Sequence, residues 1–262
     1  MTNAALHVAR TGLDAQNTKM RVIANNLANV NTTGFKKDRA DFETLAYQQI
    51  IQAGSNSDSE NKFANGLNLG SGVALQGTSK INTQGTLNQT NNVLDIAIEG
   101  SGYFQVQQPD GSIAYTRAGN FSVTAEGTVV TSDGLPLIPQ ITVPQGATSV
   151  AIGNDGTVTA TLQGESEPSN LGQIEIASFM NPSGLTSIGG NLLTESAASG
   201  VPQVGVAGLE GRGLMRSGYL ETSNVNIVEE LVDMIETQRA YEVNSKMISA
   251  TDEMLKYVNQ NI

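Results

Sequence analysis

The residues that could carry chemistry are few, and their spacing forms no catalytic set. The chain has no cysteine and one histidine, His7, inside a predicted helix, so the usual zinc ligand sets are missing. Paired carboxylates can cleave glycosidic bonds, but Asp110, Asp133 and Asp155 each precede a glycine between β-type runs, which is typical of hairpin turns. Neither a phosphate-binding glycine loop nor a nucleophile elbow occurs. The sequence therefore predicts no enzyme activity, no cofactor and no metal site.

Charge is distributed unevenly along the 262 residues, whose formal net charge is −11. Residues 1–40 carry six basic and two acidic groups, whereas residues 90–210 carry one basic group, Arg117, and eleven acidic groups. Such an acidic body lacks the basic face that nucleic-acid binding requires, and we interpret the N-terminal bases as complementing a helix end. No run of 18 apolar residues occurs, so the sequence also predicts no membrane insertion.

A long helix is predicted over residues 4–30, capped by Thr2 or Asn3. Its apolar positions alternate in steps of three and four, which is the pattern of a heptad seam with one polar position. The seam consists of Leu6, Ala9, Leu13, Gln16, Met20, Ile23, Leu27 and Val30. A helix of this length spans roughly 40 Å. We select Leu6, Leu13, Met20, Ile23 and Leu27 as its candidate contact residues.

The C-terminal region carries a second seam, preceded by the capping residues Thr222, Ser223 and Asn224. This seam consists of Ile227, Leu231, Met234, Gln238, Tyr241, Ser245, Ile248, Asp252 and Leu255. A second apolar row lies beside it, formed by Val243, Met247, Ala250, Met254 and Tyr257. An apolar surface this wide indicates more than one neighbour. The candidate contact residues here are Asn224, Ile227, Leu231, Met234, Gln238, Tyr241, Ile248 and Leu255.

Between the helices, short β-type runs separated by turn dipeptides predict one all-β domain. The predicted class is therefore α+β, with terminal helices paired in a coiled-coil-like bundle, an inserted all-β domain, and a long loop or hairpin after the first helix. We expect four regions: the N-terminal helix (1–34), an extended connector (35–89) with an insert at about 50–75, the β-rich domain (90–213) and the C-terminal helical region (214–262).

The stretch "NNLANVNTTGFKK" (residues 25–37) ends the first helix in amides, and its Asn-Val-Asn phrase returns at residues 224–226. Asparagine tolerates the left-handed conformation and can cap a helix. We expect Asn29 or Asn31, with Gly34, to end the first helix, and Ser223 or Asn224 to start the second. The candidate residues of this motif are Asn25, Asn26, Asn29, Asn31, Gly34 and Phe35. They either hydrogen-bond between subunits or only cap helices within one subunit.

Both terminal stretches resemble the signatures of the bacterial flagellar axial proteins, which are the rod, hook and hook-associated subunits. The C-terminal match runs over "GYLETSNVNIVEELVDMIETQRAYEVNSKMISATDEML" (residues 218–255). The middle, "IEGSGYFQV" with "DGSIAYTRAGNFSV" and "EGTVVTSDGLPL", resembles the β domain of hook and longer rod proteins. The chain length and the insert at about 50–75 are similar to those of distal rod subunits. A proximal rod subunit with a similar β domain, or a hook subunit, is the alternative within the family.

The resemblance implies a structural subunit that stacks helically into a tube, with the paired terminal helices around an export channel and the β domain facing outward. The candidate contact residues then become assembly residues between copies. Spacing alone favours an ordinary intramolecular helix pair or a dimeric coiled coil. Outside the family, the alternatives are an exported adhesin with a helical stalk and an enzyme acting on cell-wall glycan.

The resemblance also implies partners and a location. The partners are further copies of the chain, proximal rod proteins, the hook protein, the surrounding P- and L-ring proteins, the rod cap and the flagellar type III export apparatus. The location is the basal-body rod, which spans the periplasm to the outer membrane. Export without a cleaved signal peptide is expected, because no continuous apolar segment follows the first charges.

Overall fold

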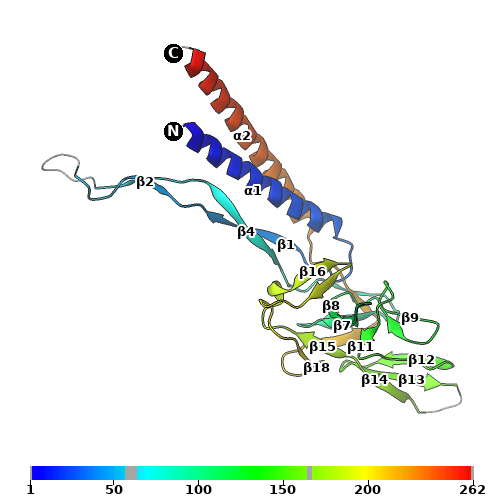
Figure 1. The fold of residues 1–262 in the computed structure, drawn as a ribbon. Helices are drawn as coiled ribbons and strands as arrows, with labels where there is room; N and C mark the ends of the chain where they lie inside the picture. The colour runs from blue at the N-terminus through cyan, green and yellow to red at the C-terminus, as the bar shows by residue number, and fades with distance from the viewer. Residues whose placement is uncertain (1, 57–63, 164–166, 261–262) are drawn as a thin grey trace. The chain divides into compact units, whose positions relative to one another are not determined.

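The structure is a computed structural model that describes residues 2–56, 64–163 and 167–260 (Figure 1). The chain divides into two compact units. The helix unit comprises Met1–Leu27, Asp38–Ser79 and Ile227–Ile262. The β unit comprises Ala28–Lys37 and Lys80–Asn226. The chain thus passes repeatedly between the units, and segment 28–37 belongs to the β unit although it directly follows the first helix.

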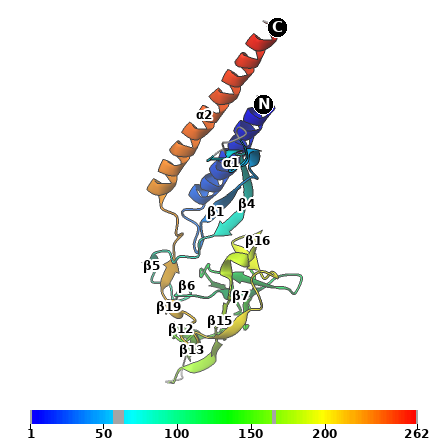
Figure 2. The ribbon, with the colours of Figure 1, turned by 90° about the vertical axis from the view of Figure 1, so that its left-hand side faces the viewer.

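The helix unit contains the two long helices of the chain. Helix α1 runs over Thr2–Ala28 and helix α2 over Ile227–Gln260, and they lie side by side in both Figure 1 and Figure 2. The predicted first helix, 4–30, is therefore displaced by two residues at each end. It ends at Ala28 because asparagine and glycine, which follow, are poor helix formers. Two acidic residues, Glu229 and Glu230, occupy the first turn of α2, where their negative charges stabilise the helix by interacting with the positive end of its dipole.

A two-stranded arm completes the helix unit. Strand β1 (Asp38–Thr44) pairs with β4 (Val73–Lys80), and β2 (Gln48–Ile51) pairs antiparallel with β3 (Leu67–Leu69). The tip of the predicted insert, 57–63, lies outside the described residues. The Thr11 hydroxyl of α1 accepts a hydrogen bond from the Val73 amide at 3.4 Å, so the arm contacts α1 within this unit.

The β unit is built from short antiparallel strands. Its largest sheet has five strands in the order β11-β7-β8-β17-β16, and a second sheet has three in the order β12-β13-β14. The remaining strands form the pairs β15–β18, β19–β6, β20–β5 and β10–β9. The bounds are β5 Leu87–Gln89, β6 Ile96–Glu99, β7 Phe104–Gln107, β8 Ile113–Thr116, β9 Ser122–Val123, β10 Val129–Val130, β11 Leu137–Ile138, β12 Ala147–Ile152, β13 Thr157–Leu162, β14 Ser169–Gln173, β15 Glu175–Ser178, β16 Thr186–Gly189, β17 Leu192–Thr194, β18 Gln203–Val206, β19 Leu214–Ser217 and β20 Tyr219–Glu221, with a 3-10 turn at Pro182–Gly184.

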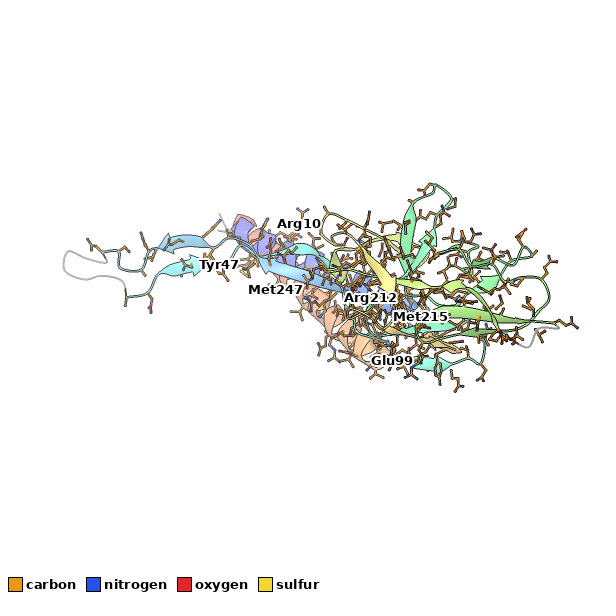
Figure 3. All side chains as sticks on the ribbon, turned by 90° about the horizontal axis from the view of Figure 1, so that it is seen from below. Arg10, Tyr47, Glu99, Arg212, Met215 and Met247 are labelled. Atoms are coloured by element: carbon orange, nitrogen blue, oxygen red, sulfur yellow. The ribbon has the colours of Figure 1, made fainter. Side chains whose placement is uncertain are left out.

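The core of the β unit is aliphatic with a few aromatic rings. Met215, labelled in Figure 3, is fully buried among Ile98, Phe104 and Ile176. The rings of Phe104 and Phe121 meet edge to face with their centroids 5.1 Å apart. Burial of side chains from β6, β7, β15 and β19 therefore joins segments far apart in the sequence, which is the main source of stability for such a unit.

Two expectations about this region have clear outcomes. The Asp-Gly dipeptides at 110–111, 133–134 and 155–156 are turns, as predicted, and each glycine has a positive φ. The expected C-terminal helical region, 214–262, instead begins with strands β19 and β20, and α2 starts only at Ile227. The reason is that β19 pairs with β6 and β20 with β5, so their backbone groups are satisfied in sheets rather than in a helix.

Candidate functional site

The two helices run antiparallel and share a defined register. Asn26 of α1 donates from Nδ2 to Glu230 Oε2 of α2 at 3.3 Å. A Cβ added to Gly12 of α1 would lie 3.1 Å from Nδ2 of Asn244 in α2. Moving fourteen residues back along α1 therefore corresponds to moving fourteen residues forward along α2. This is the spacing of two full heptads on each helix.

The predicted seam of α1 is only partly covered within the chain. Ile23 is buried, while Leu6, Leu13, Met20 and Leu27 are half-buried. These four recur every seventh residue, so they form one apolar stripe along α1. The structure thus places all five selected residues on one side of the helix, and of these five only Ile23 is fully buried.

The face of α2 that approaches α1 is largely polar. Glu230 and Thr237 are both buried, and the half-buried Asn244 follows seven residues later. Thr237 donates from its hydroxyl to the Asp233 carbonyl at 2.6 Å, which satisfies the hydroxyl inside the helix. A polar residue at a seam position fixes register at some cost in stability. The contact between α1 and α2 is therefore specific but weakly apolar.

The apolar side chains of α2 lie mostly on the side away from α1, which we call the outer face. Its members share substantial exposure in the single chain: Ile227, Val228, Leu231, Val232, Ile235, Val243, Met247, Met254 and Tyr257. Ile235, for example, is 50% exposed and Val228 is 70% exposed. Exposed apolar side chains in this number along one helix usually mark an interaction site.

The predicted C-terminal seam is split by this arrangement. Ile227 and Leu231 belong to the outer face, Tyr241 and Gln238 are exposed, and Met234 and Ile248 are half-buried. The side chain of Leu255 lies outside the described residues. The contact that the single chain makes between its helices therefore leaves most of the predicted seam uncovered.

Asn26 is the buried asparagine of the amide motif and joins three elements of the helix unit. It is 2% exposed. Its Nδ2 donates to the Asp38 carbonyl at 2.9 Å, and its Oδ1 accepts from the Asp38 amide at 2.9 Å. Together with the bond to Glu230, these contacts hold the end of α1, the start of β1 and the start of α2 together. The side-chain amide of Asn26 is therefore used within the chain.

The other residues of the motif shape the turn after α1. Asn25 and Asn31 are exposed, whereas Asn29 is half-buried and accepts a hydrogen bond from the Thr32 hydroxyl at 3.1 Å. Gly34 has a φ of +68°, the left-handed conformation expected for the residue that redirects the chain. The Phe35 ring lies beneath the Lys80 ammonium, 5.7 Å from the ring centroid.

A buried ionic cluster lies next to this turn, inside the β unit. Glu221 is 1% exposed and accepts from Lys36 Nζ at 2.6 Å and from Arg117 Nε at 2.6 Å. Its Oε1 also accepts from the Gly85 amide at 2.9 Å. With Asn224, which contacts the same segments, these residues form what we call the terminal clasp: Lys36, Arg117, Glu221 and Asn224.

The clasp holds two cations and one carboxylate away from water, and backbone carbonyls supply the missing acceptors. Arg117 donates to the carbonyls of Ile98, Gly100 and Gly102, while Lys36 donates to the Thr83 carbonyl at 2.8 Å. A buried charge is tolerated only when it is paired and hydrogen-bonded in this way.

The pKa values in the clasp reflect these competing effects. Burial raises the pKa of Glu221, but the charge of Arg117 and the hydrogen bond and charge of Lys36 outweigh it, so the pKa lies below its ordinary value of 4.5. Burial lowers the pKa of Lys36 below 10.5, and contact with Glu221 opposes this only in part. The carboxylate of Glu221 is therefore held in its charged form, whereas burial disfavours the charged form of Lys36.

Asn224 connects three segments of the β unit. Its Oδ1 accepts from the Lys37 amide at 2.8 Å, and its Nδ2 donates to the Ile81 carbonyl at 2.8 Å. The same Nδ2 lies 3.0 Å from the Thr83 hydroxyl. This differs from the expected role as the cap of α2, since the side chain of Asn224 contacts other segments. Ser223 Oγ accepts from the Val225 amide at 3.2 Å, two residues before α2 begins.

Two glycines permit the close approach of backbones at the clasp. A Cβ on Gly34 would lie 2.6 Å from the carbonyl carbon of Arg117, and one on Gly85 would lie 1.9 Å from the Thr222 oxygen. No side chain fits at either distance without movement of the backbone. Gly34 also donates from its amide to the Glu221 carbonyl at 2.8 Å, so the segment after α1 lies directly against β20.

Sequence reasoning did not find the clasp. The N-terminal bases were expected to complement a helix end, but α1 has no basic residue in its last turn, and Lys36 pairs with Glu221 instead. Lys36 and Glu221 are separated by 185 positions, so no local pattern connects them. One signal was present: Arg117 is the single base among eleven acids over residues 90–210, and a lone cation in such a segment needs a particular partner.

Within residues 2–56, 64–163 and 167–260 the structure brings together no group of three or more side chains able to hold a metal ion. His7 lies against the Ser71 carbonyl, with its Nδ1 at 3.3 Å. Asp110 and Asp155 accept hydrogen bonds from Ser112 and Thr157 in their own turns, and these bonds lower the pKa of both carboxyls.

Among the described helices, none is both long enough and apolar enough to span a bilayer.

Three segments of the chain match flagellar protein families. Residues 6–36 match the flagella basal body rod protein family, and residues 97–160 match the flagellar hook protein FlgE/F/G D1 domain. Residues 216–261 match the C-terminal region of flagellar basal body rod FlgEFG proteins. The first and last of these include the amide motif and the Glu221–Asn224 phrase, respectively.

Curated relatives match over nearly the whole chain. The flagellar basal-body rod protein FlgG of Buchnera aphidicola subsp. Acyrthosiphon pisum is 51% identical over 256 residues, covering 98% of each chain. The proteins of the same name from Caulobacter vibrioides and Bacillus subtilis are 46% and 39% identical, covering 98% and 96% of each chain. The resemblance to flagellar axial proteins expected from the terminal motifs is thereby confirmed.

Proposed function

The chain belongs to the family of flagellar basal-body rod proteins and is a structural subunit of the distal rod, and from this premise we propose that copies of it assemble into a helical tube. The tube transmits torque from the motor to the hook and encloses the export channel. A head-to-tail interface that does not close on itself generates such a filament. We further propose that the chain has no catalytic activity.

The outer face of α2 is the observation that carries this proposal. Its side chains are apolar and exposed in the single chain, whereas the face toward α1 is polar. An ordinary intramolecular helix pair would bury the apolar side and expose the polar one. The reversed arrangement is therefore explained if other copies of the chain cover the outer face.

The half-buried stripe on α1 supports the same reading. Leu6, Leu13, Met20 and Leu27 retain apolar surface that α2 does not cover. We propose that α1 and α2 pair in a coiled-coil-like manner and that both stripes gain further cover in the tube. The exposed amides Asn25 and Asn31 then lie where contacts between copies can form, while Asn26 acts within its own chain.

The remaining partners follow from the place of a distal rod subunit. We propose contacts with proximal rod proteins, the hook protein and the surrounding P- and L-ring proteins, and passage through the type III export apparatus to the rod cap. Absence of cysteine suits this route, because no disulfide can obstruct threading of an unfolded chain. The rod then spans the periplasm to the outer membrane.

The test is fibre formation by the intact chain and by Ile235→Glu, which places a carboxylate on the outer face. Ile235 is 50% exposed, so the single chain should keep its helix content and melting temperature. Burying the unpaired carboxylate between copies costs several kcal/mol, so the critical concentration should rise by about two orders of magnitude.

Ile235→Val is the matched control, because it keeps an apolar side chain at the same place and should assemble like the original chain. Assembly of Ile235→Glu at the original critical concentration would contradict the proposed role of the outer face. An exported adhesin with a helical stalk, the alternative outside the family, would remain unassembled in all three forms.

A further inference from the structure

The terminal clasp lies at the place where the chain leaves the β unit. Four passages join it to the helix unit, and they precede Ala28, follow Lys37, precede Lys80 and follow Asn226. Lys37, Ile81 and Asn224, each within two residues of a passage, are hydrogen-bonded to one another. The Ile81 amide donates to the Lys37 carbonyl at 2.9 Å, and Asn224 bonds to both residues.

The ionic part of the clasp reinforces the same three segments. Lys36 comes from the first, Gly85 from the second and Glu221 from the third, and the carboxylate of Glu221 accepts from both of the others. The Thr222 amide also donates to the Thr86 carbonyl at 2.9 Å. Charge-assisted bonds of this kind are shorter and stronger than neutral ones, so they decide whether the junction stays closed.

We propose that Lys36, Glu221 and Asn224 are positioning residues for assembly. They hold three of the four passages of the chain at one place in the β unit, those that lead to β1, β4 and α2. Segment 28–37, which follows α1, is held by the same bonds, so that the end of α1 and the start of α2 can meet in the Asn26–Glu230 register. This inference rests on the proposed function, since positioning of the helices matters only if the helices assemble. None of the three residues needs to touch another copy.

The connection from clasp to helix is short on the α2 side. Asn224 precedes Ile227 by three residues, which span at most roughly 11 Å. The start of α2 is therefore tied closely to the clasp. On the α1 side, Gly34 is held against the Glu221 carbonyl six residues after α1 ends. If the clasp opens, the end of α1 and the start of α2 both become more mobile. The conformational entropy that the chain must lose on assembly is then larger.

The clasp also makes the order of folding depend on both ends of the chain. Lys36 and Arg117 can form their ion pairs only after Glu221 is present, and Glu221 lies 185 and 104 positions further along the chain, respectively. A chain that emerges from its N-terminus onward therefore cannot close the junction until nearly all of it is present.

The test compares Lys36→Met, which keeps the aliphatic stem and removes the charge, with Lys36→Arg, which restores a cation. Hydrogen exchange in the intact chain reports on the junction segments 34–37, 81–86 and 221–224 and on the core segments 103–107 and 174–178. Lys36→Met should speed exchange in the junction by about tenfold or more, the effect of losing a charge-assisted hydrogen bond, and leave the core protected. Its critical concentration for fibre formation should rise by a similar factor, and Lys36→Arg should return both toward the original values.

Arg212→Met is the matched control, because Arg212 is a buried base of the same unit that pairs with Glu210 and not with a clasp residue. It should change neither junction exchange nor assembly. Three results would overturn the inference: junction exchange unchanged in Lys36→Met, junction and core exchange rising together, or an open junction with unaltered assembly. If the original chain forms no fibres, the proposed function fails and the inference falls with it.

Discussion

Glu221→Gln is the substitution whose energetic cost the structure defines most sharply. Glutamine has nearly the same shape and still offers an acceptor oxygen, but it removes the one negative charge from between Lys36 and Arg117. Both bases are buried, with side chains 7% and 6% exposed, so water cannot replace the lost carboxylate. Removing one partner of a buried ion pair costs about 3–5 kcal/mol.

That cost translates into a measurable shift in melting temperature. The β unit has the size of a single ordinary domain, for which 1 kcal/mol corresponds to about 2–4 °C. We therefore expect its melting temperature to fall by roughly 6–20 °C. Scanning calorimetry of the intact chain measures this directly, and urea unfolding followed by tyrosine absorbance provides the free energy of unfolding.

The double variant Glu221→Gln, Lys36→Met separates charge from shape. Removing the second charge relieves an unpaired cation, so the double variant should be more stable than the sum of its two single variants predicts. A loss of less than about 0.5 kcal/mol for Glu221→Gln, the size of an ordinary surface substitution, would refute the view that the clasp is desolvated. So would strict additivity in the double variant.

Four further predictions concern the clasp and the turn after α1. Because the pKa of Glu221 lies below 4.5 when folded, its contribution is present above that pH and is lost as the pH falls through the folded value, so stability measured from pH 7 to 3 should fall more steeply in the original chain than in Glu221→Gln. Lys36 has the same sign in a higher pH window, since its lowered folded pKa should make the original chain gain stability relative to Lys36→Met as the pH rises toward 10.5. Gly34→Ala should destabilise the β unit by at least about 1 kcal/mol, seen as a lower urea midpoint, because φ is +68° and the new Cβ meets the Arg117 backbone. Asn26→Ala should cost about 1–3 kcal/mol and loosen the start of β1 in hydrogen exchange, because the Asp38 amide and carbonyl lose their partner.

The local parts of the fold could be predicted from the sequence because their signals are local. The alternating apolar positions from Leu6 to Leu27 identify α1, and its end is off by two residues only because the terminal turn depends on tertiary contacts. The turns at Asp110, Asp133 and Asp155 follow from residue type alone.

The clasp could not be predicted in this way. Arg117 and Glu221 are 104 positions apart, and each is surrounded by residues that give no hint of burial. The polar face of α2 could not be predicted for another reason. A helix seam is recognised by its apolar positions, whereas Glu230 and Thr237 occupy the buried positions here. Tertiary pairing, rather than helix periodicity, decides which face is covered.

The division into units was also beyond sequence reasoning. Segment 28–37 follows α1 directly but belongs to the β unit, because Gly34 and Lys36 bond to Glu221 rather than to the helices. Composition gives no boundary there. The amide phrases shared by residues 29–31 and 224–226 do suggest a contact between these two segments, and Asn224 accepts a hydrogen bond from the Lys37 amide.

Covering of the outer face of α2 by other copies is the central claim, and thiol labelling tests it most directly. The chain has no cysteine, so Ile235→Cys provides a unique reporter on the outer face, and Ser132→Cys, in an exposed turn of the β unit, provides a reference. The account predicts rapid labelling of Ile235→Cys in dilute single chains and strong protection in assembled fibres. Equal labelling in both states, or protection already in the dilute chain, would contradict it.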